Sequence, residues 1–182
     1  MCHAIARSVS AETACARFHK PSPRKRGPGL VRGHGPSSAA EYRAAATGRA
    51  ALEAYFASAE FDPEVFTPAD HAAVFGAWSW MGTVVDQVLK TDQGGMVDDD
   101  LAYVTPWGCD LREISTPVLV VHGAQDRLVP SSHAIWLAQR CRTAELWLRP
   151  DDGHVSILNS SVMTLDWLRE HVSHRRTPDP LR

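Results

Sequence analysis

The chain has 182 residues, of which 44% are hydrophobic and 22% are charged, a composition typical of globular proteins. Its apolar runs are much shorter than the roughly 20 residues of a membrane-spanning helix, so a membrane protein is not expected. Charge is divided unevenly. Residues 1–33 carry seven Arg or Lys side chains against one acid, whereas the rest of the chain carries twelve against twenty.

The basic N-terminal segment, residues 1–35, is predicted to be a disordered arm that is foreign to the fold. It is rich in proline and shows no apolar period. Nucleic-acid binding is one alternative, but the segment lacks the aromatic side chains or helix that would contact bases. An organellar transit peptide is another, although an amphipathic helix is hard to find outside residues 5–18. Its cysteines and histidines lack the spacing of zinc ligands, so no metal or cofactor is predicted. Because the apolar region of a secretory signal is missing, a cytoplasmic location is expected.

Residues 36–100 are predicted to form a helical segment without strands. The stretch Ala39–Glu60 is rich in alanine and reads as one helix, with Gly48 as its weak point. Thr67 is a helix N-cap, because a hydroxyl here precedes a proline at the first helical position.

A second helix is predicted over His71–Lys90, where apolar side chains recur at helical spacing. We expect this stripe to pack in a core, and Gly76 and Gly82 to be the points at which the helix breaks. The acidic run Asp98–Asp100 is interpreted as solvated charge, since it lacks the spacing of a calcium loop.

The C-terminal part, residues 101–172, has the pattern of an α/β fold. Val118–Val121 is an uninterrupted apolar strand, which is expected when both faces of a parallel sheet are covered. A helix, a second strand at Ala144–Leu148 and a final helix that begins at Ser160 or Ser161 follow. The last residues, 173–182, are predicted to be a frayed tail.

Two candidate site residues follow these strands. Asp126 lies a few residues beyond the first strand, and His154 lies in an Asp-Gly-His turn after the second. Polar groups just past the carboxyl ends of parallel strands form the ligand crevice of such sheets. We therefore expect Asp126 and His154 to lie together at one edge. Asp151 and Asp152 compete weakly as the acid, and His122 is interpreted as structural.

The pattern of Pro117–Leu158 (strand, H-G, x-x-D, x-x-V-P, helix, strand, D-G-H) resembles the C-terminal part of α/β-hydrolases. The segment Asp98–Ile114, with its P-W-G-x-D-L motif, resembles the return from cap to core in a subgroup of that family. Its Trp107 is expected to pack behind the strand. The resemblance implies a partial α/β-hydrolase fold in which residues 36–100 are a helical cap. It also implies that Asp126 and His154 are two members of a catalytic triad.

The third member, a nucleophile, is missing from the pattern. No G-x-S-x-G motif occurs in the sequence, and Ser79 is flanked by bulky tryptophans. The resemblance runs from about Gly35 to His171, whereas a complete hydrolase of this type needs roughly 250 residues. The pattern thus predicts a truncated hydrolase of the serine type, inactive by itself.

Two classes of function remain open. The first is an ester or amide hydrolase that acts on a small-molecule substrate when complete. The second is a non-catalytic remnant, or a module that binds a small molecule or a protein. Neither nucleic acid nor a membrane is predicted as a partner. An unpaired edge of the strand Val118–Val121 favours self-association.

Overall fold

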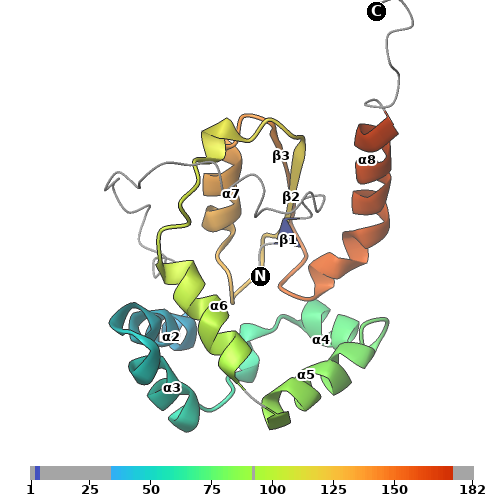
Figure 1. The fold of residues 1–182 in the computed structure, drawn as a ribbon. Helices are drawn as coiled ribbons and strands as arrows, with labels where there is room; N and C mark the ends of the chain where they lie inside the picture. The colour runs from blue at the N-terminus through green and yellow to red at the C-terminus, as the bar shows by residue number, and fades with distance from the viewer. Residues whose placement is uncertain (1–2, 5–33, 92, 174–182) are drawn as a thin grey trace, which may run out of the picture.

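The computed structural model describes residues 3–4, 34–91 and 93–173. The predicted arm and tail fall almost wholly outside these ranges. The molecule has two parts, the helical part, residues 36–104, and the sheet part, residues 111–173. Figure 1 shows the helical part below and the sheet part above.

The sheet part is built on two parallel strands. β2 (Val118–Gly123) and β3 (Ala144–Arg149) pair in parallel, with Val118 opposite Ala144 and Gly123 opposite Arg149. Helix α7 (Ser131–Arg140) makes the crossover between them. A short 3-10 turn, η3 (Ser156–Ser160), then leads into α8 (Ser161–Ser173). The α/β class predicted from the sequence is thus confirmed.

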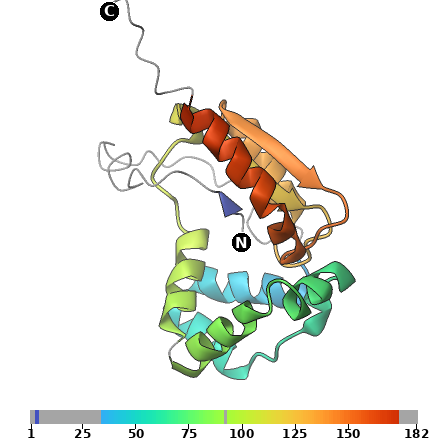
Figure 2. The same cartoon turned by 90° about the vertical axis from the view of Figure 1, so that its right-hand side faces the viewer.

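Both faces of this small sheet are covered, as the apolar strand predicted. Helices α7 and α8 lie on opposite faces, as Figures 1 and 2 show from two directions. The buried cluster of the sheet part consists of Leu119, Val121, Ile157 and Trp167. The other edge of β2 pairs in antiparallel fashion with β1 (His3–Ala4), with His3 opposite Val121 and Ala4 opposite Val120.

The helical part contains five α-helices among its described residues: α2 (Pro36–Thr47), α3 (Arg49–Ser58), α4 (Pro68–Phe75), α5 (Trp80–Thr91) and α6 (Gly94–Val104). Two short 3-10 turns, η1 (Pro63–Val65) and η2 (Leu111–Glu113), lie before α4 and before β2. The single helix predicted over Ala39–Glu60 is wrong. Gly48 has a φ of 128°, a left-handed conformation that favours glycine, and it separates α2 from α3.

The second predicted helix is also divided, but at one glycine rather than two. The chain turns at Gly76, where α4 ends, whereas Gly82 lies inside α5. The apolar stripe predicted to pack in a core is wrong in part, because Phe75 is 82% exposed and Val85 is exposed as well. Trp107 is half exposed, so at most part of its side chain packs behind the strand.

The core of the helical part lies between α2, α3 and α6. It is formed by Ala45, Leu52 and Val97, with aromatic side chains of α3 packed against it. Asp100 of α6 is buried beside this core, so the prediction that the whole run Asp98–Asp100 is solvated is wrong for its last member. Asp98 and Asp99 are exposed.

Two carboxyl groups meet between α2 and α6. Glu41 and Asp100 lie beside each other, and burial raises the pKa of both carboxyl groups. Asp100 Oδ2 is buried and has no hydrogen-bond partner among the described residues. Burial and then the neighbouring Asp100 raise the pKa of Glu41 from 4.5 to about 8.

Glu41→Gln should therefore make the stability of the chain less dependent on pH. A raised native pKa gives stability that is complete below about pH 4.5 and is lost as pH rises through about 8. The amide does not ionise, so the loss between pH 5 and 9 should shrink by about 1–2 kcal/mol, allowing for partial solvent screening of Glu41. Urea unfolding at both pH values measures this. Glu60→Gln, at an exposed carboxyl, is the control and should leave the pH dependence unchanged.

Candidate active site

The acid of the candidate site, Asp126, is held by its own loop. It follows the end of β2, and its side chain is only 3% exposed. Asp126 Oδ1 accepts hydrogen bonds from the backbone N–H groups of Leu128 and Val129, both at 2.9 Å. An aspartate that caps its own turn in this way has a fixed orientation. Its second oxygen, Oδ2, points away from these amides and is free for another partner.

That partner is His154. Its Nδ1 lies 2.9 Å from Asp126 Oδ2, so the ring donates a proton from Nδ1 to the carboxylate. Burial alone would raise the pKa of Asp126, but the hydrogen bond and charge of His154 and the Val129 amide outweigh it and lower that pKa. The prediction that the two groups meet at one sheet edge is confirmed as geometry.

The other nitrogen of His154 remains open. The side chain is 18% exposed, and Nε2 makes no hydrogen bond with any residue that the structure describes. A neutral imidazole that donates from Nδ1 has a lone pair on Nε2. The ring can therefore accept a proton from a group that approaches from the open side.

His122 lies beneath the pair and has a structural role, as the sequence indicated. It is buried, and its Nε2 donates to Val129 O at 3.0 Å. The same Nε2 atom lies 3.8 Å from Asp126 Oδ2. Burial lowers the pKa of His122, which keeps the ring neutral. The part of the chain that the structure describes holds no group of three or more His, Cys, Asp or Glu side chains suited to a metal ion.

The two glycines of the motifs allow the loops to pack closely. A Cβ atom on Gly123 would lie 2.3 Å from the backbone oxygen of Asp152 and 2.4 Å from that of Gly153. A hydrogen bond of 2.9 Å from Gln125 N to Asp152 O also joins the two loops at this point. The end of β2 thus touches the loop of His154 backbone to backbone, which sets the distance between the acid and the histidine.

Sequence reasoning missed one further residue of this region, Asp70. Asp70 lies in the first turn of α4 and forms a capping box with Thr67. Its side chain is fully buried, and Oδ1 also accepts from Val155 N, Ser156 N and Ser156 Oγ at 2.8, 2.8 and 2.9 Å. Because those partners lie about 85 residues away in the sequence, no local pattern could have revealed them.

Neither Ser79 nor Ser156 takes the place of the nucleophile beside His154. Ser156 is buried, and its hydroxyl donates to Asp70 and accepts from Gly153 N at 2.7 Å. Ser79 is exposed in the turn between α4 and α5. Among the described residues, no hydroxyl hydrogen-bonds His154, so they supply an acid and a base without a nucleophile.

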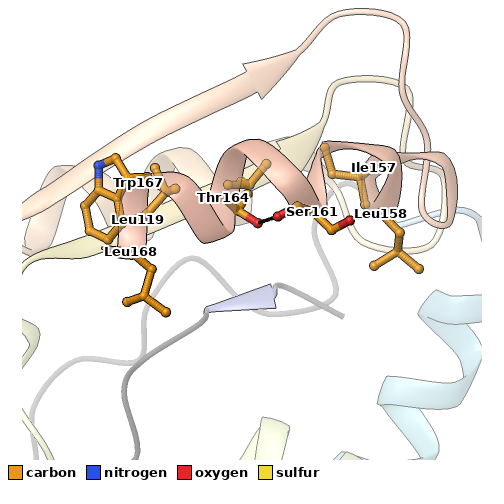
Figure 3. A pocket seen from close by; sticks show the side chains of 8 residues that line it. Leu119, Ile157, Leu158, Ser161, Thr164, Trp167 and Leu168 are labelled. Atoms are coloured by element: carbon orange, nitrogen blue, oxygen red, sulfur yellow. Dashed lines mark hydrogen bonds between the residues drawn. The ribbon is translucent and has the colours of Figure 1, made fainter. Parts of the chain in front are cut away.

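A separate apolar hollow lies on the face of the sheet that α8 covers. It encloses about 100 Å³, and Figure 3 shows the side chains that line it, from β2, η3 and α8. Two of its polar groups have partners: Thr164 Oγ1 donates to Ser161 O at 2.7 Å, and Trp167 Nε1 donates to Glu145 Oε2 at 2.9 Å. Neither Asp126 nor His154 lines it, so the hollow is distinct from the candidate site.

Comparison with known proteins places these features in context. No protein-family model matches the chain. Over 60 residues the chain is 40% identical to the pimeloyl-[acyl-carrier protein] methyl ester esterase of Aromatoleum aromaticum, a stretch that covers 33% of this chain and 24% of that protein. The chain is similar to part of an esterase. It is also 38% identical over 50 residues to the enzyme of the same name from Nitrosomonas europaea, which covers 28% of this chain and 20% of that protein.

These matches agree with the fold. The parallel β2–α7–β3 unit followed by α8 fits part of an α/β-hydrolase, and the similarity to esterases supports a hydrolase-like protein. The chain spans about a quarter or less of the length of these two relatives. Within the described residues, no helix combines the length and the apolar character needed to cross a bilayer.

Proposed function

We propose that Asp126 and His154 are the acid and the base of an ester hydrolase of the serine type. The observation that carries this proposal is the hydrogen bond of 2.9 Å from His154 Nδ1 to a buried carboxylate, with Nε2 left open. The similarity to esterases supports a carboxylic ester as the substrate class.

In this mechanism the carboxylate has two tasks. Asp126 holds the proton on Nδ1, which fixes the tautomer, and it stabilises the imidazolium that forms during the reaction. His154 Nε2 takes the proton from a nucleophilic hydroxyl as that oxygen attacks the ester carbonyl. It then returns the proton to the departing alcohol, and in the second step activates water to release the acid.

The nucleophile comes from outside the described residues, since no hydroxyl among them reaches His154. The hydrogen-bond donors that stabilise the oxyanion of the tetrahedral intermediate must also come from outside the described residues or lie close to the nucleophile. The proposal therefore assigns this chain the acid–base half of the reaction, with the substrate bound on the open side of the imidazole.

The chain by itself should hydrolyse p-nitrophenyl butyrate no faster than its His154→Ala variant. A general base alone contributes about 10²–10⁴ in rate, and only at a well-positioned substrate. Turnover that disappears in the variant would contradict this expectation and show that a residue of this chain supplies the nucleophile.

A positive test needs the missing nucleophile. If the coding DNA upstream encodes a strand, a G-x-S-x-G turn and a helix, the two polypeptides should be produced together. We expect them to hydrolyse the ester, and His154→Ala to lower kcat by at least about 10³-fold. An active pair that tolerates His154→Ala would refute the role of His154 and favour a non-catalytic module.

A further inference from the structure

One buried carboxylate of the molecule is not used in the mechanism above, yet it touches the loop that carries the base. Asp70 lies in the first turn of α4, in the helical part, and η3 packs against that helix. Figure 1 shows α4 just below the start of α8. Asp70 thus joins the helical part to the residues that immediately follow His154.

The contacts of Asp70 divide between its two oxygens. Oδ2 accepts from Thr67 N at 2.9 Å and from Thr67 Oγ1 at 2.8 Å, within the helix start. Oδ1 accepts three hydrogen bonds, all from the loop: the backbone N–H groups of Val155 and Ser156 and the Ser156 hydroxyl. Helix capping alone would need only the first set.

The residues on both sides of His154 converge on this carboxylate. Val155 and Ser156 bond to it directly, and Gly153 N donates to the Ser156 hydroxyl that in turn donates to Asp70. A Cβ atom on Gly153 would overlap the Asp70 carboxyl group, so this loop lies directly on it. The backbone of residues 153–156 is therefore fixed from one point.

The charge of Asp70 strengthens these bonds. Burial would raise the pKa of Asp70, but the hydrogen bonds from Ser156, Thr67 and Val155 outweigh it and lower the pKa to about 2. Asp70 is ionised at neutral pH, and hydrogen bonds to a charged acceptor are roughly twice as strong as neutral ones.

We propose that Asp70 is a positioning residue that holds the His154 loop in register with Asp126, so that the hydrogen bond between the acid and the base depends on α4. This inference rests on the proposed function. It adds that the helical part takes part in the chemistry by setting the orientation of the imidazole. A movement of α4 moves the loop, since the two share one carboxylate.

The test follows the His154 ring by NMR in the full chain, labelled with ¹⁵N. The tautomer of the neutral ring and the midpoint of its titration report the bond to Asp126. In Asp70→Asn we expect loss of the Nδ1–H tautomer, because the ring no longer faces the Asp126 carboxylate.

Three further variants separate positioning from other effects. Ser156→Ala removes two loop bonds but keeps the charge at Asp70, so it should shift the tautomer in the same direction and excludes a purely electrostatic cause. Thr67→Val removes only the hydroxyl of the helix cap, and we expect the ring to remain as in the wild type. Leu52→Ala, in the core of the helical part, lowers stability without touching the loop and should not alter the ring.

The outcomes are distinct. If His154 in the wild type is not the Nδ1–H tautomer, the proposed function fails. If the wild type has that tautomer and both Asp70→Asn and Ser156→Ala keep it, the positioning role of Asp70 is refuted while the acid–base pair stands. If Thr67→Val changed the His154 tautomer as much as Ser156→Ala does, the effect of Asp70 would be that of a helix cap and the positioning role would be refuted. Should Asp70→Asn fail to fold, Ser156→Ala decides.

Discussion

Gly123→Ala should destabilise the chain by more than about 3 kcal/mol, or unfold it. The added Cβ would lie within 2.4 Å of two backbone oxygens, those of Asp152 and Gly153. A backbone atom cannot turn aside as the end of a long side chain can, so either β2 or the His154 loop must move. Urea unfolding followed by circular dichroism measures the loss, and the NMR signals of His154 report any displacement of the loop.

Gly82→Ala is the matched control. Gly82 lies inside α5, and a Cβ atom there would meet nothing within 4 Å. Glycine in a helix interior is less stable than alanine, so this variant should gain about 0.5–1 kcal/mol. If Gly123→Ala unfolded at the same urea concentration as the wild type, the close backbone contact between β2 and the His154 loop would be wrong.

The sheet part was predictable because its signals are local. An uninterrupted run of Val and Leu indicates a strand covered on both faces, and glycine after such a strand indicates a turn. Asp126 and His154 each follow a strand, and parallel strands bring their carboxyl ends to one edge. These facts suffice to place the two side chains together, and the structure confirms that placement at 2.9 Å.

The helical part was less predictable, because a helical period does not say what covers each face. The stripe that includes Phe75 and Val85 has the spacing of a buried face, yet both side chains are exposed. Asp100 was wrongly expected to be solvated, because a run of acids carries no sign that one member points into a core. Its partner Glu41 is 59 residues away in the sequence.

Asp70 shows the same limit at the candidate site. Its helix-capping role follows from Thr67 and Pro68, which are neighbours in the sequence. Its bonds to Val155 and Ser156 depend on how α4 packs on η3, and no spacing within α4 encodes that contact. Tertiary contacts of this kind need the fold, whereas caps and turns need only the local residues.

The chain should self-associate in solution. Among the described residues, the edge of β2 that faces away from β3 has a partner only at Val120 and Val121, in β1, and an unpaired edge is a template for another strand. On α8, one face packs on the sheet while Val162 is 68% exposed and Leu165 is exposed beside it. Burying such a side chain contributes about 1.5–3 kcal/mol, so two copies gain by covering these surfaces.

Light scattering coupled to size exclusion, over a range of concentrations, measures this. We expect a mass above that of the 20.0 kDa monomer, and a double variant Val162→Lys, Leu165→Lys should weaken the association at least about tenfold, since it removes two apolar anchors from each copy. Ala50→Lys, Ala54→Lys, at exposed positions of α3, adds the same charge without removing a large apolar side chain and should leave the mass unchanged. A monodisperse monomer with a sharp cooperative melt would contradict the expectation. It would mean that the chain is stable while the edge of β2 and the side chains of Val162 and Leu165 stay exposed to solvent.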